Sequence, residues 1–213
     1  MKKAAAGLFA VLATVTLAGT ASAQVCAGYP SSDRGFYFGG RADFPENGDS
    51  FGVEADYNAS GPLGVYGGLN VLSGEGDDED EESFNEYFAG VAFETPSLGL
   101  MIGPRVSACP VVEGRLLSID GLGDFVQIPI GLGIGADLGI PVGPSVSGYV
   151  QPQLVISRFN PEDDAFDSDS ETNFGIKAGA MVGFSLLTIG GEVRHVFQED
   201  ADPQFGIRVG IRL

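Results

Sequence analysis

The feature that most constrains the fold is a strict alternation of apolar with small or polar residues. Along 124–138 it places five branched side chains at every second position: Val126, Ile128, Ile130, Leu132 and Ile134. The positions between them hold mainly glutamine, proline and glycine. A two-residue period is typical of a β-strand with two different faces, and the chain shows almost no helical period. We therefore predict an all-β fold.

The same alternation predicts about ten strands. Their expected ranges are 35–44, 49–58, 62–73, 84–94, 98–109, 124–138, 144–159, 172–184, 187–198 and 203–213. Most of these segments are long enough to cross a membrane, because a tilted strand needs about 9–11 residues.

The connections between these strands alternate in length and charge. Short connections ("ASG", "TPS", "IPVG", "SL") follow every second strand. The others are longer and mostly acidic: residues 75–82 contain seven acids and 162–171 contain six, without Lys or Arg. One long connection surrounds "VVEGRLLSIDGLG". Since an up-and-down sheet puts alternate connections at opposite ends, one end should be short and neutral and the other long and acidic.

With this architecture, residues 36–213 resemble the small, porin-like outer-membrane β-barrel proteins of diderm bacteria. The resemblance implies an antiparallel up-and-down transmembrane β-barrel of about ten strands, with eight as the alternative. It also implies short periplasmic turns, acidic extracellular loops and an apolar face toward lipid. A soluble barrel that binds an apolar ligand is the other interpretation, but its water-facing side should be rich in Lys, Glu and Thr rather than Gly.

The first residues have the pattern of a secretory signal. Lys2 and Lys3 precede an apolar run of about 16 residues, and Ala21-Ser22-Ala23 provides a cleavage site. We expect residues 1–23 to be a cleaved signal peptide and 35–213 to form the barrel domain. Residues 24–34 would be an N-terminal segment able to plug the lumen.

Net charge excludes one class of partner. The chain carries 11 basic and 29 acidic residues, a formal charge of −18. Removal of Lys2 and Lys3 leaves 9 basic residues, so the exported chain is still more acidic. Binding to nucleic acid depends on neutralising phosphates with basic side chains, and is therefore not expected.

Charged residues recur on the polar face of the predicted strands. The six acids are Asp43, Glu54, Asp56, Glu86, Asp137 and Glu192, and the six bases are Arg41, Arg105, Lys177, Arg194, Arg208 and Arg212. Their balance predicts that they pair inside a narrow or closed lumen, because stranding one buried partner is costly.

The two cysteines, Cys26 and Cys109, could form one disulfide in an exported protein. Cys109 falls at the far end of the predicted fifth strand, whereas the N-terminus lies at the short-turn end. A disulfide would then require residues 24–34 to thread the lumen. The alternatives are two free thiols or a strand count that is wrong near Cys109.

Two positions could serve a metal ion or catalysis. Asp167, Asp169 and Glu171 alternate in "DSDSE" and could bind a divalent cation, but they lack the full calcium-loop pattern. His195 is the only histidine, and it is expected on the outer face without a serine beside it. We expect no catalysis and no cofactor.

Aromatic residues gather near the predicted strand ends, as in the interfacial girdles of membrane barrels. They are Phe36, Phe44, Phe51, Tyr57, Phe84, Phe93, Phe125, Phe174, Phe184, Phe197 and Phe205.

The resemblance favours a structural or surface-interaction role through the acidic loops in the outer membrane. Outer-membrane lipids, lipopolysaccharide and divalent cations at the loops are the expected partners. A narrow passive channel is the alternative function, and the sequence leaves the oligomeric state open.

Overall fold

The computed structural model describes residues 35–45, 48–58, 62–74, 82–93, 98–99, 105–119, 123–138, 144–161, 168–184, 186–198 and 201–213. The strands are β1 (Gly35–Phe44), β2 (Asp49–Asn58), β3 (Leu63–Gly74), β4 (Glu82–Phe93), β5 (Leu98–Gly99), β6 (Arg105–Ile119), β7 (Gly123–Leu138), β8 (Ser145–Pro161), β9 (Asp169–Phe184), β10 (Leu187–Val196) and β11 (Gln204–Arg212). Among these residues, no helix is long and apolar enough to span a membrane.

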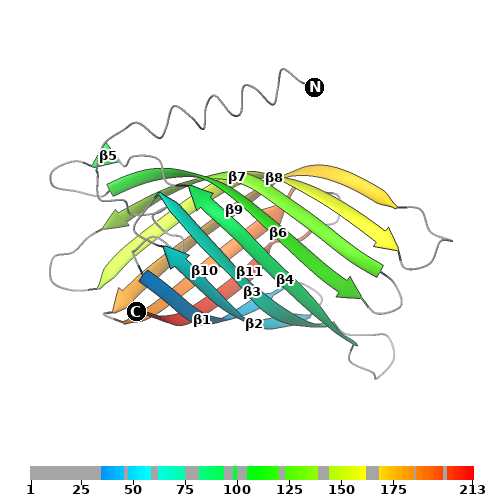
Figure 1. Cartoon of the computed structure of the whole chain (residues 1–213), viewed down its shortest axis with the longest axis horizontal. Helices are drawn as coiled ribbons and strands as arrows, with labels where there is room; N and C mark the ends of the chain where they lie inside the picture. Colours follow the sequence, from blue (N-terminus) through cyan, green and yellow to red (C-terminus); the bar gives the residue numbers. More distant parts are fainter. Residues whose placement is uncertain are drawn as a thin grey trace, which may run out of the picture.

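Ten of these strands close into an antiparallel barrel (Figure 1). Each pairs with its neighbours in sequence, β11 pairs with β1, and β4 pairs directly with β6. The two-residue β5 pairs only with β6 and lies outside the ring. The predicted antiparallel barrel of about ten strands is therefore confirmed. Closure pairs the backbone groups that would otherwise be exposed at a sheet edge.

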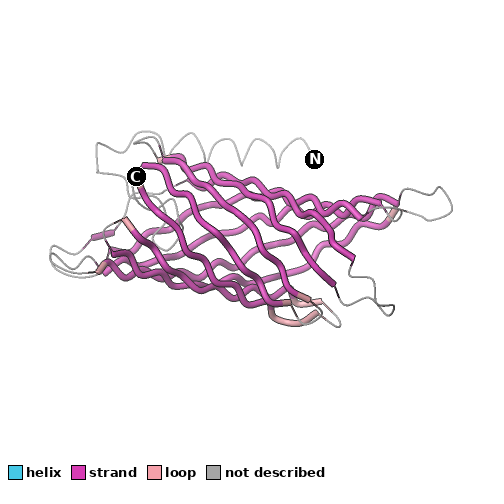
Figure 2. Tube along the Cα trace, turned by 90° about the horizontal axis from the view of Figure 1, so that it is seen from below, coloured by secondary structure: helices cyan, strands magenta, loops and turns pink. Residues whose placement is uncertain are grey.

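The strand register fixes the stagger of the barrel. We start at Arg41 and step from each residue to its Cα partner on the next strand. In the direction of β2, these steps end at Asp169 on β9. In the other direction, through β11 and β10, they lead to Met181, twelve residues farther along the same strand. This offset requires tilted strands, and Figure 2 shows them inclined to the long axis.

The distribution of apolar and polar side chains is the reverse of that in a soluble protein. Large apolar side chains are exposed on the outside, for example Phe51 at 58%, Leu154 at 53% and Ile207 at 52%. The buried side chains of the interior are mostly polar or charged, among them Arg41, Glu54 and Lys177.

The prediction for the fifth strand is wrong in position. The expected strand 98–109 is replaced by β6, which begins at Arg105 and continues to Ile119. The segment interpreted as a long loop, "VVEGRLLSIDGLG", is therefore mostly strand. Its charges suggested a solvated loop, but Glu113 and Arg115 alternate with Val112, Gly114 and Leu116 and point into the barrel.

This shift also changes the pattern of connections. The connection after β4 runs from 94 to 104 and contains β5, so the expected short "TPS" turn is wrong. The connection after β6 spans only 120–122. We call the end where β1 passes into β2 the loop end, and the end where β1 begins and β11 finishes the turn end. The acidic stretches 75–81 and 162–167 connect strands at the loop end but lie outside the described residues.

Candidate functional site in the barrel interior

The centre of the interior is the carboxylate of Glu192 on β10. It lies 3.2 Å from Nη2 of Arg41, 2.7 Å from Nη2 of Arg208 and 3.7 Å from Nζ of Lys177. The Tyr149 hydroxyl also donates to it. Since Glu192 is only 7% exposed, these partners replace the water that its charge loses on burial.

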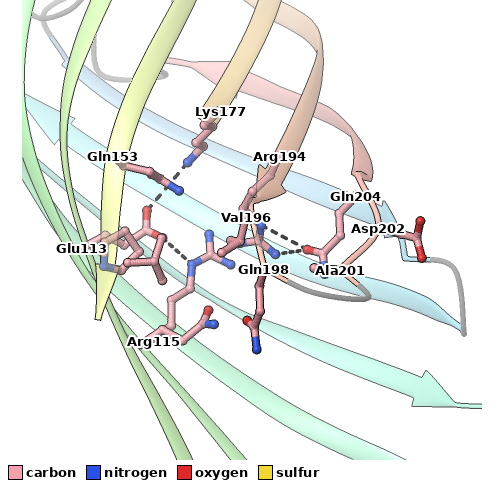
Figure 3. Close-up of a pocket in the computed structure, with 13 residues that line it drawn as sticks. Glu113, Arg115, Gln153, Lys177, Arg194, Val196, Gln198, Ala201, Asp202 and Gln204 are labelled. Carbon is pink, nitrogen blue, oxygen red and sulfur yellow. Dashed lines mark hydrogen bonds and ion pairs between the residues drawn. The ribbon is translucent and has the colours of Figure 1, made fainter. Parts of the chain in front are cut away.

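A second centre is Glu113 on β6, which the sequence interpretation missed. Nε of Arg115 donates to its Oε1, and the Tyr66 hydroxyl donates to its Oε2 at 2.8 Å. Nζ of Lys177 lies 3.8 Å from the same Oε2. Lys177 therefore joins the Glu113 and Glu192 centres across the barrel. Figure 3 shows its contact with Glu113.

Further ion pairs extend from the two centres toward the wall. Arg208 also lies 3.7 Å from Glu54, and the Tyr37 hydroxyl donates to Glu54 at 3.3 Å. Nε of Arg41 donates to Asp43 at 2.6 Å. Each arginine thus contacts two carboxylates from different positions on the wall.

The Glu113 centre is extended in the same way toward β4. Nη1 of Arg115 lies 3.0 Å from Oε1 of Glu86, whose other oxygen accepts from Asn70 at 2.7 Å. The buried Phe88 ring has its centroid 6.0 Å from the guanidinium carbon of Arg41 and 5.7 Å from that of Arg115. The ring therefore makes cation–π contacts with arginines of β1 and β6.

Together these side chains form what we call the ion-pair network. It comprises Arg41, Asp43, Glu54, Glu86, Glu113, Arg115, Lys177, Glu192 and Arg208. With its tyrosine partners it links β1, β2, β3, β4, β6, β8, β9, β10 and β11. Such a network links the strands across the interior of the barrel. Removal of one member would leave its partners as buried charges without a counter-charge.

A hollow lies beside the network, toward the loop end. Two cavities of about 160 and 170 Å³ share Arg115, Gln127, Arg194 and Gln204 in their walls, and we call them together the vestibule. Their linings also reach Pro45, next to the first loop-end connection, and Asp202, next to the last. A third cavity, next to Phe88, measures only about 20 Å³. Figure 3 shows the network side of the vestibule, with Glu113, Arg115 and Lys177.

The twelve charges expected in the lumen fall into three groups. The network brings together Arg41, Asp43, Glu54, Glu86, Lys177, Glu192 and Arg208. Asp56 is buried in the interior, Arg194 bonds to Gln204, and Arg212 is half-buried at the end of β11. Arg105 and Asp137 are opposite each other in the β6–β7 register, but their side chains lie outside the described part.

The position of Cys109 differs from the expectation. Because β6 starts at Arg105, Cys109 lies in the turn-end half of its strand rather than at the far end. It is fully buried in an apolar cluster with Ala92, Val111 and Tyr149, and it is not a free thiol. Cys26 lies outside the described residues, so the pairing stays a prediction.

The other candidate sites gain no support from the described residues. Asp167 lies outside them, Asp169 and Glu171 are exposed, and no group of three or more potential metal ligands occurs within them. His195 packs edge-on against Phe197 on the outer face, with ring centroids 4.7 Å apart.

No protein-family model matches the chain, and no curated protein sequence matches it. Several solved structures are similar. LpxR from Salmonella typhimurium is 12% identical with a TM-score of 0.47, covering 91% of this chain and 79% of its own. The transport unit of the autotransporter AIDA-I from Escherichia coli is 14% identical with a TM-score of 0.47, covering 97% of both chains. The N-terminal β-barrel domain of Pseudomonas aeruginosa OprF is 14% identical with a TM-score of 0.35, covering 85% of this chain and 98% of its own. At these values the likenesses carry no argument about activity, and the barrel assignment rests on the strand register.

Proposed function

We propose that this protein is a non-catalytic outer-membrane β-barrel that keeps its lumen closed and presents acidic loops for structural or surface-interaction roles. One observation carries the proposal: apolar side chains cover the outside of the barrel, while an ion-pair network crosses the inside. An apolar outer face is suited to contact with lipid. Paired charges that cross the lumen stabilise the wall and block the passage of solutes.

The outer face supports a membrane position. Exposed aromatic side chains occur toward the loop end at Phe44, Phe51, Tyr87, Phe174, Phe197 and Phe205, and toward the turn end at Phe36, Tyr57 and Phe184. Two bands of this kind are typical of membrane interfaces. Phe84 and Phe125 were expected in these bands, but the strand register directs them to the interior face.

Charges on the outer face support the same orientation. Among the described residues, Asp49, Asp124 and Arg158 are outward-facing charges, and all three lie near the loop end of their strands. The middle of the outer face is apolar, as contact with hydrocarbon requires. Lipids and lipopolysaccharide are therefore the proposed partners of the barrel, and divalent cations those of its acidic loops.

Two measurements test membrane insertion. The protein should stay in the membrane fraction until detergent is added, and the unboiled protein should migrate faster on a gel than the boiled protein. Recovery from the periplasm without detergent would instead support a soluble barrel.

Conductance in planar bilayers tests closure of the lumen. We expect no stable openings for the wild-type protein. Stable openings that change when Arg208 is replaced by Glu would establish the alternative, a narrow passive channel. A control is Arg158→Glu, because Arg158 lies on the outer face and should not affect ion flow.

The processing of the chain forms a second part of the proposal. Residues 1–23 would be removed, and Cys26 would bond to Cys109. The buried, non-free sulfur of Cys109 in the turn-end half supports this pairing. A segment from Cys26 to Gly35 can extend about 30 Å. Because β1 begins at the turn end and Cys109 lies in the turn-end half of β6, this segment would need to reach only part of the way into the lumen. Peptide mapping without reductant should find a new N-terminus at Gln24 and a linked Cys26–Cys109 peptide.

A further inference from the structure

Arg194 differs from the cations of the ion-pair network. Arg41, Arg115, Lys177 and Arg208 each lie within 3.7 Å of a carboxylate oxygen. No carboxylate among the described residues lies within 4.0 Å of the Arg194 guanidinium. Its Nε donates to the Gln204 side-chain oxygen at 3.1 Å, and its Nη2 donates to the same atom. This amide oxygen is neutral, so the charge of Arg194 is not neutralised.

One atom of this guanidinium also has no hydrogen-bond partner within the described part of the chain. Nη1 of Arg194 is buried and unsatisfied. A buried polar atom without a partner is rare in folded proteins and often marks the position of a water molecule or an ion. Nη1 itself is covered in this structure, but the arginine lines the vestibule, so a rotation of its side chain brings Nη1 to an acceptor in that hollow.

The charges already present in the vestibule favour an anion. Its carboxylates Asp43, Glu86 and Glu113 are each engaged by an arginine of the network. Asp202 is exposed at the rim. Among the described cations of the vestibule, Arg194 is therefore the one without a carboxylate partner, so its charge can attract an anion. The chain as a whole is strongly acidic.

The remaining polar wall is made of amides. Gln127, Gln153, Gln198 and Gln204 line the 160 Å³ cavity of the vestibule (Figure 3 labels all of these except Gln127). An amide side chain can donate to one hydroxyl group and accept from another. A cavity of about 160 Å³ is similar in size to one of about 150 Å³ that binds benzene, which limits the ligand to a small molecule.

We propose that Arg194 and the surrounding amides form a binding site for a small hydroxylated carboxylate, entered from the loop end. The carboxylate would accept from the guanidinium of Arg194, once its side chain has rotated to present Nη1, and the amides would bond to the hydroxyl groups. Binding there would not require opening of the ion-pair network, which lies deeper in the barrel.

Calorimetry of the full-length processed protein in detergent tests this site with D-gluconate as the probe. We expect saturable binding to the wild-type protein and at least tenfold weaker binding to Arg194→Gln. The matched control is Arg158→Gln, which removes an arginine from the outer face and should bind as the wild type does. Neutral D-glucose should bind at least tenfold more weakly than gluconate.

Other probes decide the chemistry of the ligand. Inorganic phosphate that binds as tightly as gluconate would overturn the assignment to hydroxylated carboxylates. Absence of gluconate binding to the wild type, or equal binding to Arg194→Gln, would overturn the site itself. If Arg194→Gln does not fold, Gln153→Ala serves instead, because Gln153 lines the cavity without bonding to Arg194. We expect it to weaken gluconate binding about threefold to tenfold, and unchanged binding would contradict the proposed amide contacts.

Discussion

The two faces of the barrel wall follow opposite rules, although the same strands build them. On β10, Glu192 points inward and bonds to three cations, while its neighbour Val193 faces out. On β7, Gln127 and Pro129 line the vestibule, while Ile128 and Ile130 are exposed outside. A charge is needed on one face and costly on the other, so the position of a residue within the alternation decides the effect of a substitution.

Loss of a charge at the centre of the interior should have the largest effect. Glu192→Gln keeps the shape but leaves Arg41, Lys177 and Arg208 with one carboxylate fewer. We expect the free energy of unfolding to fall by about 3–5 kcal/mol. Because the chain has no Trp, urea unfolding in lipid vesicles should be followed by far-UV circular dichroism. Glu171→Gln, at an exposed position of β9, is the control and should change stability little.

Gain of a charge on the outer face tests the other rule. Ile130→Arg places a guanidinium at the middle of β7, and we expect a loss of about 2–4 kcal/mol in vesicles. Asp124→Arg lies on the same strand and face but at the loop end, where the cost should be about 0–1 kcal/mol. Equal losses for the two variants would argue against a bilayer around the middle of the barrel.

Added volume should also separate the two faces. A Cβ on Gly90, inside β4, would lie 2.4 Å from Cζ of Tyr66. Gly90→Ala should therefore destabilise the barrel by about 1–3 kcal/mol through overpacking. A Cβ on Gly114, on the outside of β6, would find its nearest atom at 4.0 Å. Gly114→Ala should leave the thermal transition unchanged or slightly higher, and a lower transition would contradict the assigned faces.

Loss of one hydroxyl group should give the smallest difference. Tyr66→Phe removes the hydrogen bond to Glu113, which keeps Arg115 and Lys177 as partners, so we expect a loss of about 1 kcal/mol. Tyr57→Phe on the outer face, where the side chain is 51% exposed, should have almost no effect. The urea midpoints of the two variants provide the comparison.

Alternation was sufficient to predict the barrel and the inward direction of most charges. It failed at 98–119, because Pro110 and the charged pair Glu113 and Arg115 are typical of a loop in a soluble protein. In this barrel, Pro110 faces outward and the charges face inward, so the two-residue period continues through them. Recognising Val111, Glu113 and Leu117 as one face would have found the strand.

Partners within the interior could not be predicted in the same way. The sequence shows that Glu192 points inward, but its contact with Arg41 depends on closure between β11 and β1. The link from Lys177 to Glu113 joins strands that are not neighbours in the ring. Such contacts depend on the register and curvature of the whole barrel, which no local pattern contains.

The closing seam between β1 and β11 has a consequence for the order of assembly. It pairs Arg41 with Arg208, residues from the two ends of the barrel domain, so it cannot form before the last strand has been delivered. The contacts of Glu192 with Arg41 and of Arg208 with Glu54 cross this seam, so these two ion pairs cannot form until the ring closes. Closure of the ring and formation of these ion pairs are then a single late event, and a non-local contact of this kind is slow to form. We therefore expect the final folding step in vesicles to depend on ionic strength, while the insertion of the earlier strands does not.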